Sequence, residues 1–135
     1  MSGRWETGTR AAVLLVFSLS FSSFVLTASA SEDGLPGKQT YEQQCVSCHG
    51  SAGKGDGPAG LAALPMPRDF SVGLFKFDAD SDGRTGTDRD LFLVIRDGGA
   101  AAGGSPLMAS WAQLGDERIR ELVVYVRSLA QSRPD

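Results

Sequence analysis

The two cysteines and the one histidine of this 135-residue chain lie together in five residues, Cys45-Val46-Ser47-Cys48-His49. Two thiols three positions apart on a helical turn can each add to one of the two vinyl groups on the edge of a haem. The histidine that follows is then placed under the iron, where an imidazole serves as an axial ligand. The motif therefore predicts one covalently bound haem c, attached through Cys45 and Cys48, with His49 on the iron.

Three other uses of a Cys-x-x-Cys pair fit this sequence less well. A thioredoxin-like dithiol requires a βαβ context, and no stretch of this chain has the alternation of a strand. A structural zinc ion needs four ligands, whereas the chain has only three Cys and His residues in total. A structural disulfide would leave the adjacent His49 unexplained. Haem attachment is the interpretation that uses all three residues.

A sixth iron ligand must come from elsewhere, because the chain has no second histidine. Met108 lies in a glycine-rich loop just before the last predicted helix, on a lead long enough to reach the other face of a haem. Met66 is close in sequence to the His49 side, and methionine is also an ordinary gap-filler in protein cores. We expect Met108 to be the ligand, with Met66 and an open site as alternatives.

Two further side chains have types that suit the propionate carboxylates of a haem. The guanidinium of Arg68 can bind a carboxylate through paired hydrogen bonds, and the indole N–H of Trp111 can donate one. Sequence spacing places neither of them, so a solvated Arg68 and a Trp111 in the core are equally consistent with the sequence. We predict both as haem contacts with those alternatives open.

An acidic segment, Asp78-Ala-Asp80-Ser-Asp82-Gly83, matches the opening of an EF-hand calcium loop. Such a loop needs a bidentate acid at its twelfth position, and counting from Asp78 that position is Arg89. We therefore interpret the segment as a solvated acidic loop.

The elements that position these residues are predicted to be helices joined by long loops. One helix should extend over about residues 37–48, and another should begin at Thr87, a typical N-cap. Residues 50–60 form a glycine-rich loop, and residues 61–64 are expected to make one helical turn. The last helix has the clearest pattern, because one face of it carries an apolar stripe made of Ile119, Leu122, Val123, Val126, Leu129 and Ala130. The sequence predicts an all-α domain.

The N-terminal segment has the pattern of a targeting sequence. Two arginines precede an apolar stretch over residues 11–26, and Ala28-Ser29-Ala30 matches a small-x-small cleavage site. This predicts a signal peptide, residues 1–30, followed by one domain, residues 31–135. An uncleaved membrane anchor is the alternative, although a spanning helix needs about 20 predominantly apolar residues and this stretch is interrupted by serines.

From residue 31 onward the chain resembles the class I cytochromes c. The residues that carry the resemblance are Gly37 and Tyr41, Leu122 and Tyr125, Pro58, and the segment from Ser105 to Trp111. It implies a small cytochrome c fold of three to four helices and long loops wrapped around one covalent haem. It also implies that Gly37 lies where the first and last helices cross, that the backbone carbonyl of Pro58 accepts a hydrogen bond from the axial histidine, and that Met108 is the sixth ligand. Ala109 stands where many members of the family have proline.

With both iron faces occupied, we predict an electron carrier and not an enzyme, shuttling between periplasmic or membrane oxidoreductases. The alternative is the haem subunit of a larger oxidoreductase complex. The formal net charge of −3 and the lack of any basic run argue against nucleic acid. That charge favours redox partner proteins with a basic docking patch. We expect a periplasmic monomer that contacts a membrane only if its N-terminal segment is retained.

Overall fold

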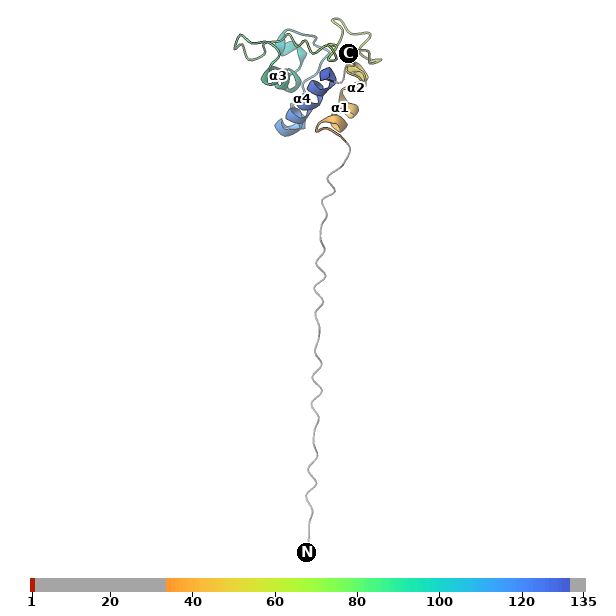
Figure 1. Cartoon of the computed structure of the whole chain (residues 1–135), viewed down its shortest axis with the longest axis vertical. Coiled ribbons are helices and arrows are strands. Elements are labelled where there is room, and N and C mark those ends of the chain that lie inside the picture. The colour runs from red at the N-terminus through yellow and green to blue at the C-terminus, as the bar shows by residue number, and fades with distance from the viewer. Residues whose placement is uncertain (2–33, 132–135) are drawn as a thin grey trace. The chain divides into compact units, whose positions relative to one another are not determined.

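The computed structural model describes Met1 and residues 34–131. The α-helices are α1 (Lys38–Gln44), α2 (Val46–His49), α3 (Asp88–Asp97) and α4 (Asp116–Gln131), with two short 3₁₀ helices, η1 (Gly99–Ala102) and η2 (Ala112–Leu114). Figure 1 shows this order, and the described residues contain no strand. The prediction of a small all-α fold is confirmed. The predicted signal peptide lies outside the described residues, apart from Met1.

Helix α4 forms because its apolar residues recur at the spacing of one helical face. Ile119, Leu122 and Val126 are 0%, 1% and 5% exposed, so this face is the centre of the core. Asp116 and Glu117 occupy the first turn, where acidic side chains interact favourably with the helix dipole. The helix therefore presents a continuous apolar surface on which α1 and α3 pack.

Helices α1 and α4 cross at a glycine. A Cβ at Gly37 would collide with the backbone carbonyl of Glu121 and would lie 2.7 Å from the backbone nitrogen of Leu122. Next to this contact the rings of Tyr41 and Tyr125 pack with their centroids 5.0 Å apart. The predicted helix crossing is confirmed, and it requires glycine because no side chain fits between the two backbones.

Helix α3 begins with a reciprocal capping box. The Thr87 hydroxyl accepts a hydrogen bond from the Asp90 N–H at 3.1 Å, and the Asp90 carboxylate accepts one from the Thr87 N–H at 2.8 Å. Asp90 is buried and also accepts a 2.6 Å hydrogen bond from the Ala79 N–H. Hydrogen bonds from Thr87 and Ala79 outweigh the effect of burial and hold the pKa of Asp90 below its usual value. The carboxylate thus anchors the preceding loop to α3.

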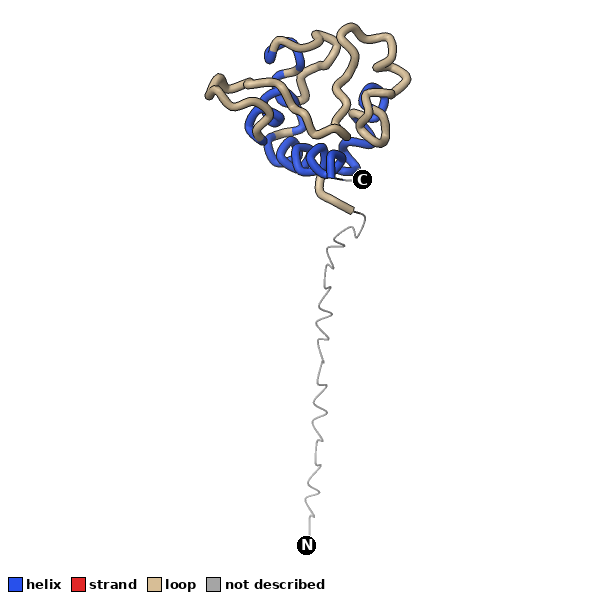
Figure 2. Tube along the Cα trace, turned by 45° about the horizontal axis from the view of Figure 1, so that its top comes forward, coloured by secondary structure: helices blue, strands red, loops and turns tan. Residues whose placement is uncertain are grey.

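The loops differ from the sequence prediction in two places. The first predicted helix is divided at Cys45, which separates α1 from α2. Residues 61–64 form a turn and not a helix. In Figure 2 most of the loop trace lies on one side of α4. The helices therefore supply the core, and the loops supply the side that surrounds the predicted haem residues.

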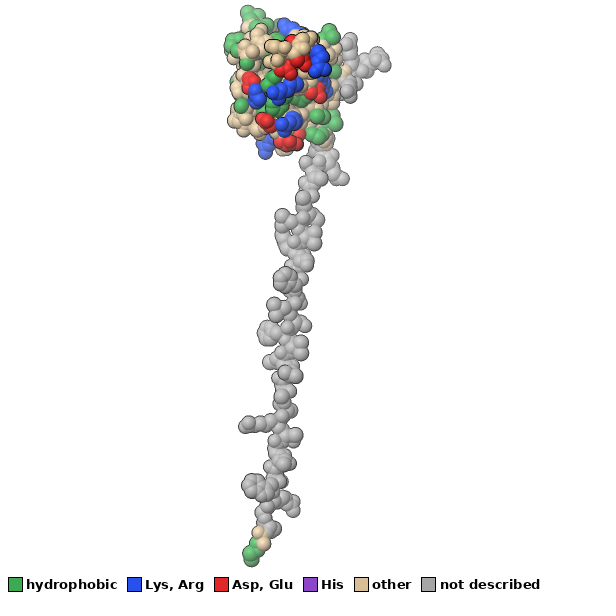
Figure 3. All heavy atoms as spheres, turned by 90° about the vertical axis from the view of Figure 1, so that its left-hand side faces the viewer, with side chains coloured by type: hydrophobic (Ala, Val, Ile, Leu, Met, Phe, Trp, Pro, Cys, Tyr) green, Lys and Arg blue, Asp and Glu red, His purple; other side chains and the backbone are tan. Residues whose placement is uncertain are grey.

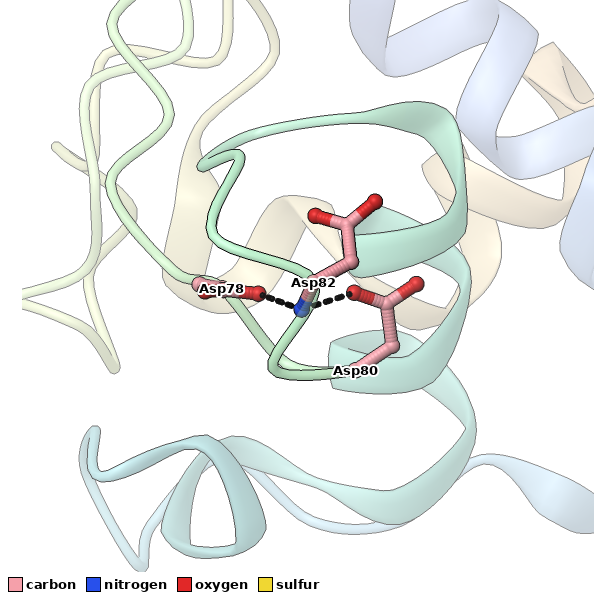
Figure 4. Close-up of side chains that lie close together, drawn as sticks. All are labelled: Asp78, Asp80 and Asp82. Carbon is pink, nitrogen blue, oxygen red and sulfur yellow. Dashed lines mark hydrogen bonds between the residues drawn. The ribbon is translucent and has the colours of Figure 1, made fainter.

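The acidic loop is arranged around its own backbone. The N–H of Asp82 donates to Asp78 at 3.0 Å and to Asp80 at 3.3 Å (Figure 4). The Asp82 carboxylate is paired with the Arg84 guanidinium at 2.7 Å. Carboxylate oxygens of the three aspartates lie within 4.8 Å of one another. Backbone N–H groups of the loop and the Arg84 guanidinium thus donate to these carboxylates.

Candidate haem-binding site

The Cys-x-x-Cys-His segment forms a single helical turn. The N–H groups of Cys48 and His49 both donate to the carbonyl of Cys45, at 3.2 and 2.9 Å. This turn brings the backbones of Cys45, Cys48 and His49 together on one helical turn. Both cysteines are free thiols and half-buried. Burial and the neighbouring Cys48 raise the pKa of Cys45 to about 11, so its thiol is protonated at neutral pH.

The glycine-rich loop folds back over the end of this turn. The N–H groups of Gly57 and Ala59 donate to the carbonyls of Cys48 and Ser47, at 3.2 and 2.9 Å. These carbonyls end a helix and would otherwise lack partners. A Cβ at Gly57 would lie only 2.5 Å from the Ser47 oxygen, so the close approach requires glycine. Pro58 is exposed on this loop, between the two residues that bind the helix end.

The imidazole of His49 is held by packing. Its ring stacks on Phe70 with the centroids 4.6 Å apart and the planes 18° from parallel. Its Nδ1 atom is buried and has no hydrogen-bond partner within the described part of the chain, so the expected bond to the Pro58 carbonyl is not formed in this structure. Burial lowers the pKa of His49, and the backbone of Arg68 has a smaller, opposing effect. The neutral imidazole that a metal requires is therefore favoured.

The Met108 loop is attached to the end of α3. The N–H of Gly99 donates to the carbonyl of Met108 at 2.9 Å, and the Met108 N–H donates to Ser105 at 3.2 Å. A Cβ at Gly99 would lie 3.0 Å from the Met108 Cβ, so the two segments are in direct contact. Met108 is half-buried, whereas the Met66 side chain is 55% exposed. Of the two candidate ligands, Met108 has the more constrained backbone.

Arg68 and Trp111 lie in different surroundings. Arg68 lines an open hollow of about 590 Å³ together with Lys76 and Arg127, and Trp111 is not among its lining residues. The backbone N–H of Trp111 donates to the carbonyls of Ile95 and Arg96 at the end of α3, at 3.1 and 3.2 Å. Three cations in one hollow suit carboxylates. Trp111 instead closes the helix that carries the Met108 loop.

Phe70 is a site residue that was not predicted from the sequence. Its N–H donates to the carbonyl of Gly53 at 2.6 Å, which brings the ring to the glycine-rich loop and to His49. The only sequence signal is its place in Pro67-Arg68-Asp69-Phe70, beside a residue that was selected. His49 ends helix α2 and Phe70 lies 21 positions later in an irregular loop, so no sequence periodicity indicates their contact.

The chemistry of these groups fits a covalently attached haem. The two cysteines are free to form thioether bonds, and the buried imidazole is disposed to be neutral. The loops that follow the motif and precede the last helix leave large apolar side chains exposed: Leu61 at 60%, Leu64 at 85%, Met66 at 55% and Leu107 at 67%. An apolar porphyrin ring would cover such surface favourably.

Comparison with known proteins agrees with this site. A family model described as "Cytochrome C oxidase, cbb3-type, subunit III" matches residues 32–126. The chain belongs to this family of c-type cytochromes. It is therefore an electron-transfer haem protein with covalently bound haem c, as the motif at Cys45–His49 predicted.

A solved structure supports the same assignment. The chain is similar to one chain of the Kuenenia stuttgartiensis reducing HAO-like protein complex, with 31% sequence identity and a TM-score of 0.59. The similarity covers 73% of this cytochrome and 44% of that longer chain, so this cytochrome corresponds to less than half of it. No curated protein matches the chain. Within the described residues, no helix has the length and apolar character needed to cross a membrane.

Proposed function

We propose that this cytochrome is a one-electron carrier in which Cys45 and Cys48 form thioether bonds to the haem, while His49 and Met108 are the axial ligands. The observation that carries the proposal is that both free cysteines and His49 belong to one helical turn, whose N–H groups at Cys48 and His49 donate to the carbonyl of Cys45. Met108 is supported over Met66 by its partial burial and by the backbone hydrogen bonds that attach its loop to α3.

Two axial protein ligands determine the chemistry. If His49 and Met108 both held the iron, no coordination position would remain for a substrate, and the bound haem would supply one-electron redox chemistry alone. A thioether ligand and an apolar surrounding favour the ferrous form and raise the reduction potential. The chain's own contribution is to hold the two ligands, exclude water and keep the imidazole neutral.

The remaining predicted site residues have supporting roles in this proposal. Arg68 binds a haem propionate, with Lys76 and Arg127 adding positive charge in the same hollow. Trp111 contributes an indole N–H to the haem surroundings. Pro58 supplies its carbonyl to His49 once the haem positions the ring, since its loop already packs over the end of the His49 helix.

For partners, we propose redox proteins that the carrier meets in the periplasm after removal of residues 1–30. Loss of residues 1–30, which contain Arg4, Arg10 and Glu6, changes the formal net charge from −3 to −4, which favours a basic docking patch on the partner. The face drawn in Figure 3 carries basic and acidic side chains intermixed. Among the described residues, Arg96 is paired with Asp97 and Arg127 with Asp88. Docking on this face would depend on individual ion pairs with the partner more than on a surface potential of one sign.

A second candidate function is that of a haem subunit in a larger oxidoreductase. The observation that favours it is the similarity to a longer chain that is part of a protein complex. In that arrangement the same haem residues would pass electrons within an assembly, and the partner would remain bound throughout.

One experiment separates the two. The carrier should elute as a monomer, exchange electrons rapidly and reversibly with a redox partner, and do so more slowly as salt is added, since salt screens charge-assisted encounter. Peroxide as sole oxidant should give no turnover. Constant co-purification with a larger redox enzyme would favour the subunit function, and peroxide turnover by the wild-type protein would contradict electron transfer as the sole function.

A further inference from the structure

We propose that Phe70 is a positioning residue that sets the orientation of the His49 imidazole, an inference that rests on the proposed role of His49 as an axial ligand. The two rings are nearly parallel, 18° apart, with 4.6 Å between centroids. A flat face at this distance lets the imidazole slide within its own plane but opposes rotation about its Cβ–Cγ bond.

The usual device for fixing such a ring is a hydrogen bond to its second nitrogen. In this chain Nδ1 of His49 is buried and has no such partner among the described residues. The stacking contact with Phe70 acts on the face of the ring, beside the interaction of the imidazole with the Arg68 backbone and in addition to the Pro58 carbonyl that we propose for the holoprotein.

Phe70 is itself firmly held. Its N–H donates to the Gly53 carbonyl at 2.6 Å, and a Cβ at Gly53 would lie 3.2–3.3 Å from the Phe70 side chain. Phe75 packs against the ring at 6.0 Å and 29°, and the Arg127 guanidinium lies 4.9 Å from the Phe75 ring. The Phe70 ring is thus held beside His49 by its own backbone bond to Gly53, whereas Phe75 is a more distant ring that packs on Phe70.

The plane of an axial imidazole decides which positions of a ferric porphyrin receive unpaired spin density. Proton NMR shifts of the haem methyl groups and the g values of the ferric EPR spectrum therefore report on that plane. A residue that only stabilises the fold would leave both unchanged in the folded protein. The prediction can be read without any measurement of electron-transfer activity.

The test uses the ferric holoprotein. Phe70→Leu should change the pattern of haem-methyl shifts, or give two sets of shifts where the wild type has one, and should move the largest g value. Phe75→Leu, a matched control that removes an equal ring not in contact with His49, should keep the wild-type pattern. Phe70→Tyr retains the flat face and should restore it. If Phe70→Leu does not accumulate with haem, Phe70→Ile carries the same expectation.

Unchanged spectra in the folded Phe70 variant, or equal changes in the Phe70→Leu and Phe75→Leu variants, would overturn the proposal. Failure of the underlying assignment is distinguishable, because the wild type itself would then lack the low-spin signature of a histidine-ligated haem. That result is visible before any variant is made.

Discussion

Replacing Gly37 with alanine tests how the helices that carry the haem site are held together. Gly37 has φ +85, in the left-handed region that favours glycine, and a Cβ there would collide with the Glu121 carbonyl. The obstacle is backbone within helix α4, which cannot rotate aside as a side chain could. The two helices must therefore separate to admit the methyl group.

The magnitude follows from two contributions. A non-glycine residue in the left-handed conformation costs about 1–2 kcal/mol. Overpacking at the helix contact adds about 1–3 kcal/mol. Gly37→Ala should therefore lower the free energy of unfolding by about 2–5 kcal/mol, a large share of the roughly 5–15 kcal/mol typical of a domain.

Gly103 offers a control matched in conformation. It has φ +74 and ψ 18, also left-handed, but a Cβ there would meet nothing within 4 Å. Gly103→Ala should cost only the conformational contribution, about 1–2 kcal/mol. Urea unfolding of the two holoproteins, followed by far-ultraviolet circular dichroism and by haem absorption, measures the difference. Equal losses for both variants would refute the argument that the Gly37 contact is sterically closed.

Three further predictions concern the site and its surroundings. Met108→Ala should abolish the methionine–iron charge-transfer absorption of the ferric protein and open the iron to cyanide or carbon monoxide, whereas Met66→Ala should change neither; the reverse result would reassign the ligand. Asp90→Asn should lower the unfolding free energy by about 1–2 kcal/mol at neutral pH, since hydrogen bonds to a charged group are lost. The pKa of Asp90 is lowered in the folded state, so this stabilisation is fully present above the pKa of the unfolded chain, about 3.9. It disappears as the pH falls through the pKa of the folded protein. Melting curves of the wild type and the variant should therefore converge in acid. Millimolar calcium should not raise the melting temperature, because the acidic loop at residues 78–82 lacks the twelfth-position acid; a clear rise would restore the EF-hand interpretation.

The parts of the fold that sequence could predict are those set by local periodicity or by an obligatory residue type. The apolar stripe of α4 and the N-cap at Thr87 depend only on residues close together in the sequence, and both are confirmed. The place of Gly37 at the helix crossing was implied by the resemblance to class I cytochromes c, and the close backbone approach explains why glycine is needed there. The reciprocal bond from Asp90 was not foreseen, although Asp90 stands three residues after the cap, where a capping box places its acid.

The parts that sequence could not predict depend on contacts between irregular segments. Nothing in the spacing of Gly53 and Phe70 indicates that their backbones are hydrogen-bonded. The stacking of Phe70 on His49 follows from that bond, so the sequence could not predict it either. Placing Arg68 beside Lys76 and Arg127 likewise required the loop path, because the three residues belong to separate segments of the chain.

The helix crossing and the haem-binding turn are one mechanical unit, and Tyr41 connects them. Its ring packs on Tyr125 at the crossing, and its hydroxyl donates a buried 2.8 Å hydrogen bond to the carbonyl of Gly50, directly after His49. Burial, with smaller contributions from neighbouring groups, raises the pKa of the Tyr41 hydroxyl, so it remains a hydrogen-bond donor across the physiological pH range. A displacement of α1 from α4 must then move the end of the helix that carries His49. Loss of helix packing and displacement of His49 should therefore occur in the same unfolding transition, because α1 and α2 meet directly at Cys45 and Tyr41 contacts both the helix crossing and Gly50.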